Sequence, residues 1–281
     1  MPRLPIFTLS VTLVLVVSTI LAPACCAGNK VNVGRSWPAD QQVSMDQVDH
    51  SAWNALLSRY VNDQGLVNYT AWKAAPADIA ALEGYLQALS QAIPQQRASR
   101  DATLAFWINA YNAVTVRGIL REYPTKSIRN HTAKVFGYNI WNDLLLTVGN
   151  RQYSLNQVEH EVLRKMGEPR IHFAIVCASI GCPPLRNEAY EAKQVGAQLS
   201  DNARRFFASR RNFAYDPAKN QIWVSSIMNW FAGDFGGDTA AQMARIAPYL
   251  PDDTARKLAT SGNASVTYLD YDWKLNDQKS P

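Results

Sequence analysis

The sequence predicts an α+β fold, a single domain in which helices pack on a mixed, mainly antiparallel sheet. Several segments repeat apolar residues at helical spacing, and short β-rich segments lie on either side of tight turns. Hydrophobic residues make up 47% of the 281 residues, which is enough to build a sizeable core. Charged residues are only 18% of the chain, a composition that argues against a disordered protein.

The first 27 residues have the pattern of a secretory signal peptide. Arg3 precedes an uncharged, mostly apolar stretch over 4–21, and small residues follow it up to position 27. We expect cleavage before Cys25 or Gly28 and an exported protein, periplasmic or extracellular. Contact with a membrane would then need one of two alternatives, an uncleaved leader or a lipidated Cys25, since about 18 apolar residues can just span a bilayer.

The rest of the chain is predicted to form one folded unit with short polar ends. Residues 28–48 are polar and show no period, so they are expected to form a tether. One domain is expected over 49–276, followed by a tail over 277–281. With Arg3 removed, the formal charge of +5 falls by one and no run of basic residues is left. This argues against a nucleic-acid-binding protein.

The predicted helices begin and end at recognisable signals. One is expected over 49–60, and the next begins at Pro76, because proline suits the first helical position. A long helix is expected over 100–122, with Ser99 as its cap and Pro124 ending it.

A hairpin is predicted over 144–148 and 152–154, around Gly149-Asn150. Ser154 and Gln157 then have the spacing of a capping box and open a helix that ends at Gly167. The β-rich run over 171–177 predicts a central strand, and a tight loop over 178–184 follows it. The remaining predicted elements are a helix over 192–209, a hairpin over 213–215 and 222–225, helices between 227 and 260, and a strand over 266–273.

Two predicted helices carry polar residues on or beside their apolar stripes. Asn112 and Asn109 lie within and at the edge of the stripe of the 100–122 helix. Glu159 and His160 lie within and at the border of the next stripe. Buried polar groups need partners, so these residues either tie the helices to neighbouring segments or border a cleft and supply acid–base chemistry.

Cys177 and Cys182 flank the loop after the predicted strand, where ligand sites often lie. His172 is five positions before Cys177, an odd separation that in a strand puts the two side chains on opposite faces. His160 is therefore the better candidate base. The spacing of the cysteines departs from that of zinc knuckles, and the sequence has neither a phosphate-binding glycine loop nor a dinucleotide fingerprint. No cofactor and no metal are expected.

Four segments together resemble the family catalogued as domain of unknown function 547 (DUF547), over roughly residues 50–276. They are 105–113 (AFWINAYNA), 154–164 (SLNQVEHEVLR), 172–185 (HFAIVCASIGCPPL) and 269–276 (LDYDWKLN). The resemblance implies that the residues to examine are Asn109, Asn112, His160, His172, Cys177 and Cys182. It implies no activity, because the name of the family assigns none.

Two functions remain open from the sequence. In the first, the protein is a cysteine-dependent hydrolase or acyl transferase of the cell envelope. Cys177 would be its nucleophile and His160 its base, Asn112 or Glu159 would orient the histidine, and backbone N–H groups over 178–181 would stabilise an oxyanion. Asn109, His172, Ser179 and Cys182 would bind an unidentified small molecule or peptide.

In the second, the protein is a non-catalytic envelope domain, for binding or structure, with a Cys177–Cys182 disulfide. In that case the bond would be an ordinary loop staple. If Cys177 is reactive, the same bond would instead be a switch that blocks Cys177 when oxidised and frees it when reduced. We expect Asn112, His160 and Cys177 to meet in one cleft if the first function is right.

Overall fold

The computed structural model describes residues 30–133 and 137–279. The predicted leader, Cys25 and positions 280–281 lie outside the described residues. Within those two ranges, no helix combines the length and the apolar character needed to cross a membrane.

The α+β class is confirmed. The helices are α1 (Ser51–Tyr60), α2 (Tyr69–Lys73), α3 (Pro76–Ser90), α4 (Arg100–Glu122), α5 (Ile140–Asp143), α6 (Leu155–Gln157), α7 (Val195–Ala208), α8 (Ile227–Trp230), α9 (Thr239–Ile246) and α10 (Asp253–Thr260).

The strands form two small sheets rather than one. The first has the order β1 (Val31–Val33), β2 (Leu144–Val148), β3 (Arg151–Ser154), and the second has the order β4 (Phe213–Asp216), β5 (Gln221–Ser225), β6 (Ser265–Leu269). Each sheet joins an antiparallel hairpin to a parallel third strand from a distant part of the chain. Both hairpins match the prediction, but the parallel pairs do not make the sheets mainly antiparallel.

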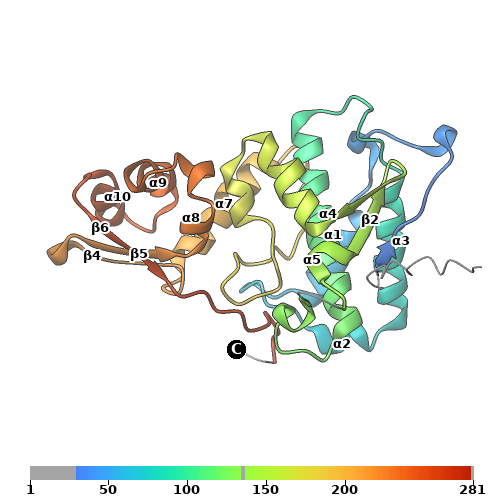
Figure 1. Cartoon of the computed structure of the whole chain (residues 1–281), viewed down its shortest axis with the longest axis horizontal. Helices are drawn as coiled ribbons and strands as arrows, with labels where there is room; N and C mark the ends of the chain where they lie inside the picture. The colour runs from blue at the N-terminus through green and yellow to red at the C-terminus, as the bar shows by residue number, and fades with distance from the viewer. Residues whose placement is uncertain (1–29, 134–136, 280–281) are drawn as a thin grey trace, which may run out of the picture.

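The molecule is elongated and has two lobes (Figure 1). The first lobe contains α1–α5 and the sheet of β1–β3, and the second contains the sheet of β4–β6 with α8–α10. Each lobe has its own apolar cluster. α7 belongs to both, because Val195 and Leu199 pack in the first cluster while Phe206 and Phe207 pack in the second.

α4 is the central element of the first lobe. It spans the predicted residues, Ser99 caps it through the N–H of Ala102, and most of its side chains are buried. Close packing against α5 and β2 depends on Gly118, where an added Cβ would lie 2.7 Å from Leu144 and 2.8 Å from Ile140. A helix buried on nearly all sides can hold polar side chains only where they find partners, and this applies to its two asparagines.

The segment predicted as a central strand is not one. Residues Pro169–Phe173 form a 3₁₀ turn, opened by Pro169 and capped by Glu168, and residues 174–177 continue without strand pairing. The apolar run could not reveal this, since a buried 3₁₀ turn and a buried strand have the same composition. The argument that placed His172 and Cys177 on opposite faces of a strand therefore no longer applies.

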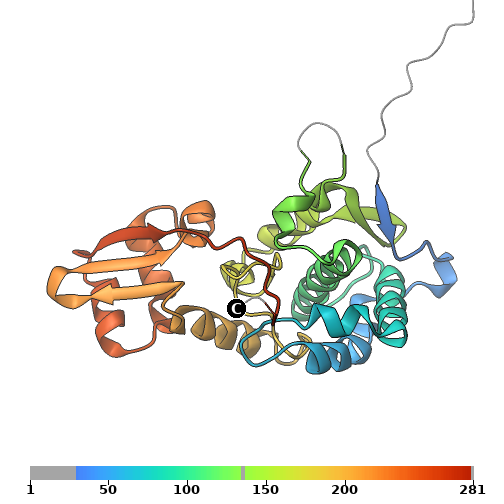
Figure 2. The same ribbon diagram turned by 90° about the horizontal axis from the view of Figure 1, so that it is seen from below.

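The expected tether and tail are largely packed against the body. Residues 31–33 pair with β2, and Val33 and Met45 are buried in the first cluster. At the other end, Asp277 is buried and pairs with Val67. Figure 2 shows the chain running back from β6 to the first lobe before it ends. Short polar segments looked unstructured in the sequence because their partners are far away along the chain.

Candidate functional site

An apolar cavity of about 170 Å³ opens between the lobes, and we call it the aromatic cavity. Its lining combines six aromatic rings, two thiols and one carboxyl group: Tyr111, Trp141, Glu159, His172, Ile175, Cys177, Cys182, Pro183, Ile227, Phe231, Tyr271 and Trp273. α4, the segment after β3, the cysteine loop, the α8 region and the segment after β6 all contribute to it. Four of the eight candidate residues are thus brought together, namely Glu159, His172, Cys177 and Cys182.

Asn112 holds the backbone that leads to Cys177. Its amide group donates to the carbonyl of Ala174 at 3.0 Å, and its carbonyl accepts from the N–H of Val176 at 2.9 Å. These bonds replace the partners that a neighbouring strand would have supplied. Asn112 therefore positions Cys177 through the main chain, and it does not orient a histidine as the sequence had suggested.

Backbone strain follows directly after the thiol. Ala178 has a φ of 57° and is buried, and this left-handed conformation is unfavourable for a residue with a Cβ. The turn is held by the chain end, because the N–H groups of Ile180 and Gly181 donate to the carbonyls of Lys274 and Asp272. Those two N–H groups are consequently occupied and do not form the expected oxyanion site.

The two cysteines are free thiols in contact, and no disulfide joins them. Their Sγ atoms lie 2.9 Å apart, and the hydroxyl of Tyr271 is 3.3 Å from Cys177 and 2.9 Å from Cys182. The hydrogen bond with Cys182 lowers the pKa of Cys177, and bonds to Tyr271 and Ser179 act the same way. Burial raises the pKa of Cys182 well above its ordinary value. The half-buried Cys177 is therefore the more readily ionised thiol of the pair.

Glu159 lies on the wall of the aromatic cavity in a π-helical stretch, Val158–Leu163, that follows α6. Such stretches are rare and often occur at functional sites. The capping box of Ser154 and Gln157 starts this helical segment as predicted. Tyr111 on α4 donates to Glu159 Oε2 at 3.2 Å. Burial raises the pKa of Glu159 to about 7, so its carboxyl group can both take up and release a proton near neutral pH.

His172 contributes a neutral imidazole held by a carboxylate. Its Nε2 lies 2.7 Å from Oδ2 of Asp234, and its ring stacks on Phe231 at 3.9 Å between centroids. Arg164 makes two hydrogen bonds to Asp234 and is the main reason that the pKa of Asp234 falls to about 2. Burial lowers the pKa of His172 to about 4. Nε2 therefore carries the hydrogen that Asp234 accepts, and Nδ1 is left as the basic nitrogen.

His160 is not brought to Cys177. It is exposed, lines a separate surface pocket with Asn156 and Glu161, and its Nδ1 lies 3.2 Å from Arg164. The expected convergence of Asn112, His160 and Cys177 is therefore wrong as stated. Glu159, one residue away on the other face, occupies the place expected for His160.

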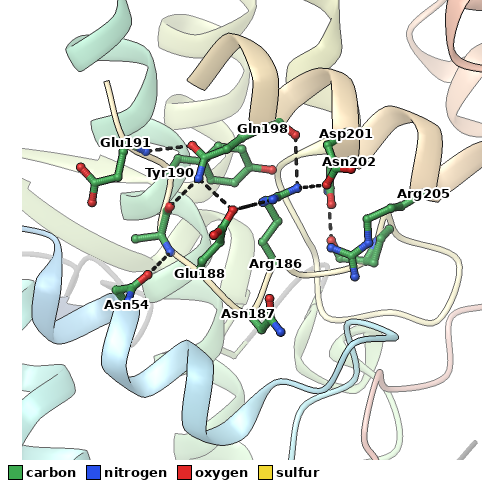
Figure 3. A network of polar contacts seen from close by, with 12 residues as sticks. Asn54, Arg186, Asn187, Glu188, Tyr190, Glu191, Gln198, Asp201, Asn202 and Arg205 are labelled. Carbon is green, nitrogen blue, oxygen red and sulfur yellow. Dashed lines mark hydrogen bonds and ion pairs between the residues drawn. The ribbon is translucent and has the colours of Figure 1, made fainter. Parts of the chain in front are cut away.

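Asn109 and Ser179 also lie outside the aromatic cavity. Asn109 exchanges two hydrogen bonds with the backbone of Tyr190, at 2.8 and 2.9 Å. Figure 3 shows the polar network around Arg186 that holds the same segment, with Glu188 and Gln198 as partners. Ser179 lines a second pocket, of about 380 Å³, on the far side of the turn at Cys182 and Pro183.

The comparison with protein families supports the resemblance noted from the motifs. The matching family model is described as "Protein of unknown function, DUF547" and covers residues 95–207. Residues 95–207 belong to the DUF547 family. Three of the four motif segments lie within this match, and 269–276 follows it. No curated protein and no solved structure matches the chain.

The DUF547 segment supplies the thiols, Glu159 and His172, but sequence reasoning missed several residues around them. Tyr271 and Trp273 lie in the fourth motif, which the sequence analysis quoted without giving them a role. No pattern in the sequence indicated a role for Asp234. Among the residues that the structure describes, no three His, Cys, Asp or Glu side chains are grouped so that they could hold a metal ion.

Proposed function

We propose that the protein is an exported cysteine-dependent hydrolase or acyl transferase that acts in the cell envelope with Cys177 as its nucleophile. The observation that carries the proposal is one cavity that holds a thiol with a lowered pKa and a carboxyl group with a pKa of about 7. Lowering the pKa of the thiol while burial raises that of the carboxyl group brings the two values closer together, which favours proton transfer between them. Export rests on the leader pattern over 1–27.

Glu159 takes the role of the proton acceptor that the sequence had assigned to His160. In the first step Glu159 accepts the thiol proton and the sulfur of Cys177 attacks the carbonyl carbon of an ester or amide. A C–S bond forms, the bond to the leaving group breaks, and the leaving group takes the proton back from Glu159. The enzyme is left as a thioester.

The thioester is then released by a second nucleophile. Water or another acceptor gives a proton to Glu159 and attacks the carbonyl carbon, and the C–S bond breaks. Cys177 returns as a thiolate, which the hydrogen bonds from Tyr271 and Cys182 stabilise. His172, held by Asp234, offers its Nδ1 to a polar group of the ligand on the same cavity wall.

The dimensions of the aromatic cavity favour a small acyl group. About 170 Å³ is close to the volume of the engineered protein cavities that admit a benzene molecule. The walls are mostly aromatic, so an apolar acyl group or the end of a peptide side chain would replace little bound water. We propose such a small molecule or peptide as the ligand.

The test is covalent capture on the full mature chain. Incubation with p-nitrophenyl acetate or butyrate at pH 7.5 should add one acyl group to Cys177, located by peptide mass spectrometry, with release of nitrophenol. Cys177→Ser should abolish both signals. Cys182→Ser is the companion variant: acylation should stay at Cys177 but become slower, because the hydrogen bond that lowers the pKa of Cys177 is altered.

Two outcomes would reject parts of the proposal. Acylation that moves to surface lysines, or that persists in Cys177→Ser, would exclude Cys177 as the nucleophile. The alternative, a non-catalytic binding or structural domain of the envelope, would then be the better description. Sequencing the amino terminus of the native protein tests export, and a protein that starts at Met1 in the cytoplasm would contradict it.

A further inference from the structure

The basic side chain beside Glu159 is already paired with another carboxylate. Among the described residues the recorded hydrogen bond of Glu159 is the one from Tyr111. Arg164, the nearest basic group, is bound through two nitrogens to Asp234. A carboxylate in an apolar cavity is costly unless a cation or several donors face it. The cavity thus has one negative charge to neutralise.

Aromatic rings line the same cavity. The rings of Tyr271 and Trp273 lie 4.5 Å apart between centroids, and Trp141 lies 6.3 Å from Trp273. Trp230 packs on both Tyr271 and Trp273 and is 48% exposed, so it carries the aromatic surface outward beyond the cavity. Aromatic faces attract organic cations, and several rings around one carboxylate are the arrangement that binds ammonium groups.

We propose that the aromatic cavity binds an organic ammonium group, held between the carboxylate of Glu159 and the rings of Tyr271 and Trp273, and that this ammonium belongs to the acyl acceptor. The inference rests on the proposed function and narrows it, because it makes the reaction a transfer to a primary amine rather than hydrolysis.

Other ligand classes fit the cavity less well. An anion would meet the carboxylate of Glu159, and the arginine on that side, Arg164, is neutralised by Asp234. Arg129 lies over Trp273 at 5.2 Å but is itself exposed to solvent. A neutral apolar ligand would leave Glu159 with its hydrogen bond from Tyr111 and with no cation facing it. Only a cation uses the rings and the carboxylate together.

The second half of the reaction follows from this placement. The bound ammonium gives one proton to Glu159, and the free amine attacks the carbonyl carbon of the Cys177 thioester. A C–N bond forms, the C–S bond breaks, and the departing sulfur takes the second proton from the attacking nitrogen, so that the thiol of Cys177 is regenerated. The proton on Glu159 leaves to solvent. An ester and an alkylammonium therefore give an amide, an alcohol and one proton.

Ammonium binding should depend on pH through the groups that face Glu159. These are Tyr111 on α4, Arg164 in the following turn, Asp234 before α9, and Cys177 in the loop. Arg164 and Asp234 stay charged across the neutral range, and burial keeps Tyr111 protonated. Binding should strengthen from pH 5 to pH 8 as Glu159 ionises.

The binding test uses the full chain with Cys177→Ser, so that no covalent chemistry intervenes. Tetramethylammonium is titrated by tryptophan fluorescence, and tert-butanol, its neutral counterpart in shape, is the control ligand. We expect saturable quenching with tetramethylammonium alone, at least tenfold weaker binding in Glu159→Gln, and weaker binding in Trp273→Ala. Equal binding of tert-butanol, or no effect of Glu159→Gln, would overturn the proposal.

A pH series on the Cys177→Ser protein gives the same information if Glu159→Gln fails to fold. Loss of binding at pH 5 is expected, and binding that is constant from pH 5 to pH 8 would overturn the proposal. The activity test adds propylamine to the native chain with p-nitrophenyl butyrate and measures N-propylbutyramide by mass spectrometry.

These experiments distinguish a failure of the ammonium site from a failure of the proposed function. Tetramethylammonium binding without any acylation of Cys177 would reject the proposed function and keep the ammonium site. Acylation of Cys177 without ammonium binding, or with butyrate as the sole product in the presence of propylamine, would keep the nucleophile and reject the amine acceptor.

Discussion

The two lobes solve the problem of a buried core in different ways. The second lobe packs aromatic and aliphatic side chains, such as Phe206, Phe207 and Ile246, under a three-stranded sheet whose backbone bonds are satisfied by strand pairing. Both lobes bury some amide side chains, but in the first lobe such amides hold the irregular backbone that leads to the site. Asn109 and Asn112 pair with irregular backbone that no strand covers.

This difference shows where a fold can place a reactive group. Strand pairing satisfies the backbone N–H and C=O groups only along a regular path, which excludes a left-handed residue. Hydrogen bonds from side-chain amides satisfy the same groups in irregular backbone, so the chain can turn at Ala178 and expose Cys177 to the aromatic cavity. The cost is a dependence on single hydrogen-bonding residues.

Phe206→Ala should have the largest effect on stability and none on the site. The side chain is fully buried against Phe173 and Phe207, so its removal should cost about 3–5 kcal/mol in the free energy of unfolding. Urea denaturation measures this loss. The rate at which iodoacetamide alkylates Cys177 in the folded protein should not change. A clear change would mean that packing in the second lobe affects the environment of Cys177.

Asn112→Ala should cost less but disturb the site. It leaves the carbonyl of Ala174 and the N–H of Val176 unpaired, and each buried group costs about 1–3 kcal/mol. We expect a loss of about 2–4 kcal/mol and an altered alkylation rate of Cys177. Asn109→Ala is the matched control, since it frees the backbone of Tyr190 instead, and it should lower stability while leaving that rate unchanged.

Glu159→Gln should stabilise the protein at high pH. The folded protein holds the proton of Glu159 up to about pH 7, whereas an unfolded chain releases it near the ordinary value of 4.5. Ionisation therefore costs stability progressively as pH rises from 4.5 to 7. Urea midpoints should show a gain of about 2–3 kcal/mol for the variant at pH 8. At pH 4 the two proteins should be equal, and a gain that persists there would refute the assigned cause.

Two helix caps give the smallest and most closely matched comparison. Ser154 caps the segment that carries Glu159, and Asp238 caps α9 in the second lobe. Replacing either residue with alanine should cost about 1 kcal/mol. Only Ser154→Ala should also shift the pH dependence of Cys177 acylation, because only it loosens the helical turn that holds Glu159. Equal acylation profiles for the two variants would contradict this.

Local signals in the sequence predicted the elements they encode. The cap at Ser99, the Gly149-Asn150 turn and the capping box at Ser154 each depend on neighbouring residues, and the structure has all three. The predicted strand over 171–177 failed because its backbone partner is the side chain of Asn112, more than sixty positions away. No pattern within the segment itself reports such a partner.

The site was predictable only in part for the same reason. Cys177, Cys182 and Glu159 stood out as polar residues in apolar surroundings, and they do share the aromatic cavity. His160 was preferred as the base because a strand over 171–177 would put His172 and Cys177 on opposite faces, whereas the chain forms a 3₁₀ turn there. Trp273 and Tyr271 come from a distant segment, so sequence spacing could not assign them to the site.

The position of Tyr271 in the chain has a consequence for the order in which the protein is made. This tyrosine contacts Cys177 from 94 positions further along, and the segment around it also bonds the turn at Ile180 and Gly181. A nascent chain that has reached residue 260 has both thiols but neither the hydroxyl that contacts them nor the wall formed by Trp273. Cys177 therefore gains its full environment only after the second lobe has been synthesised.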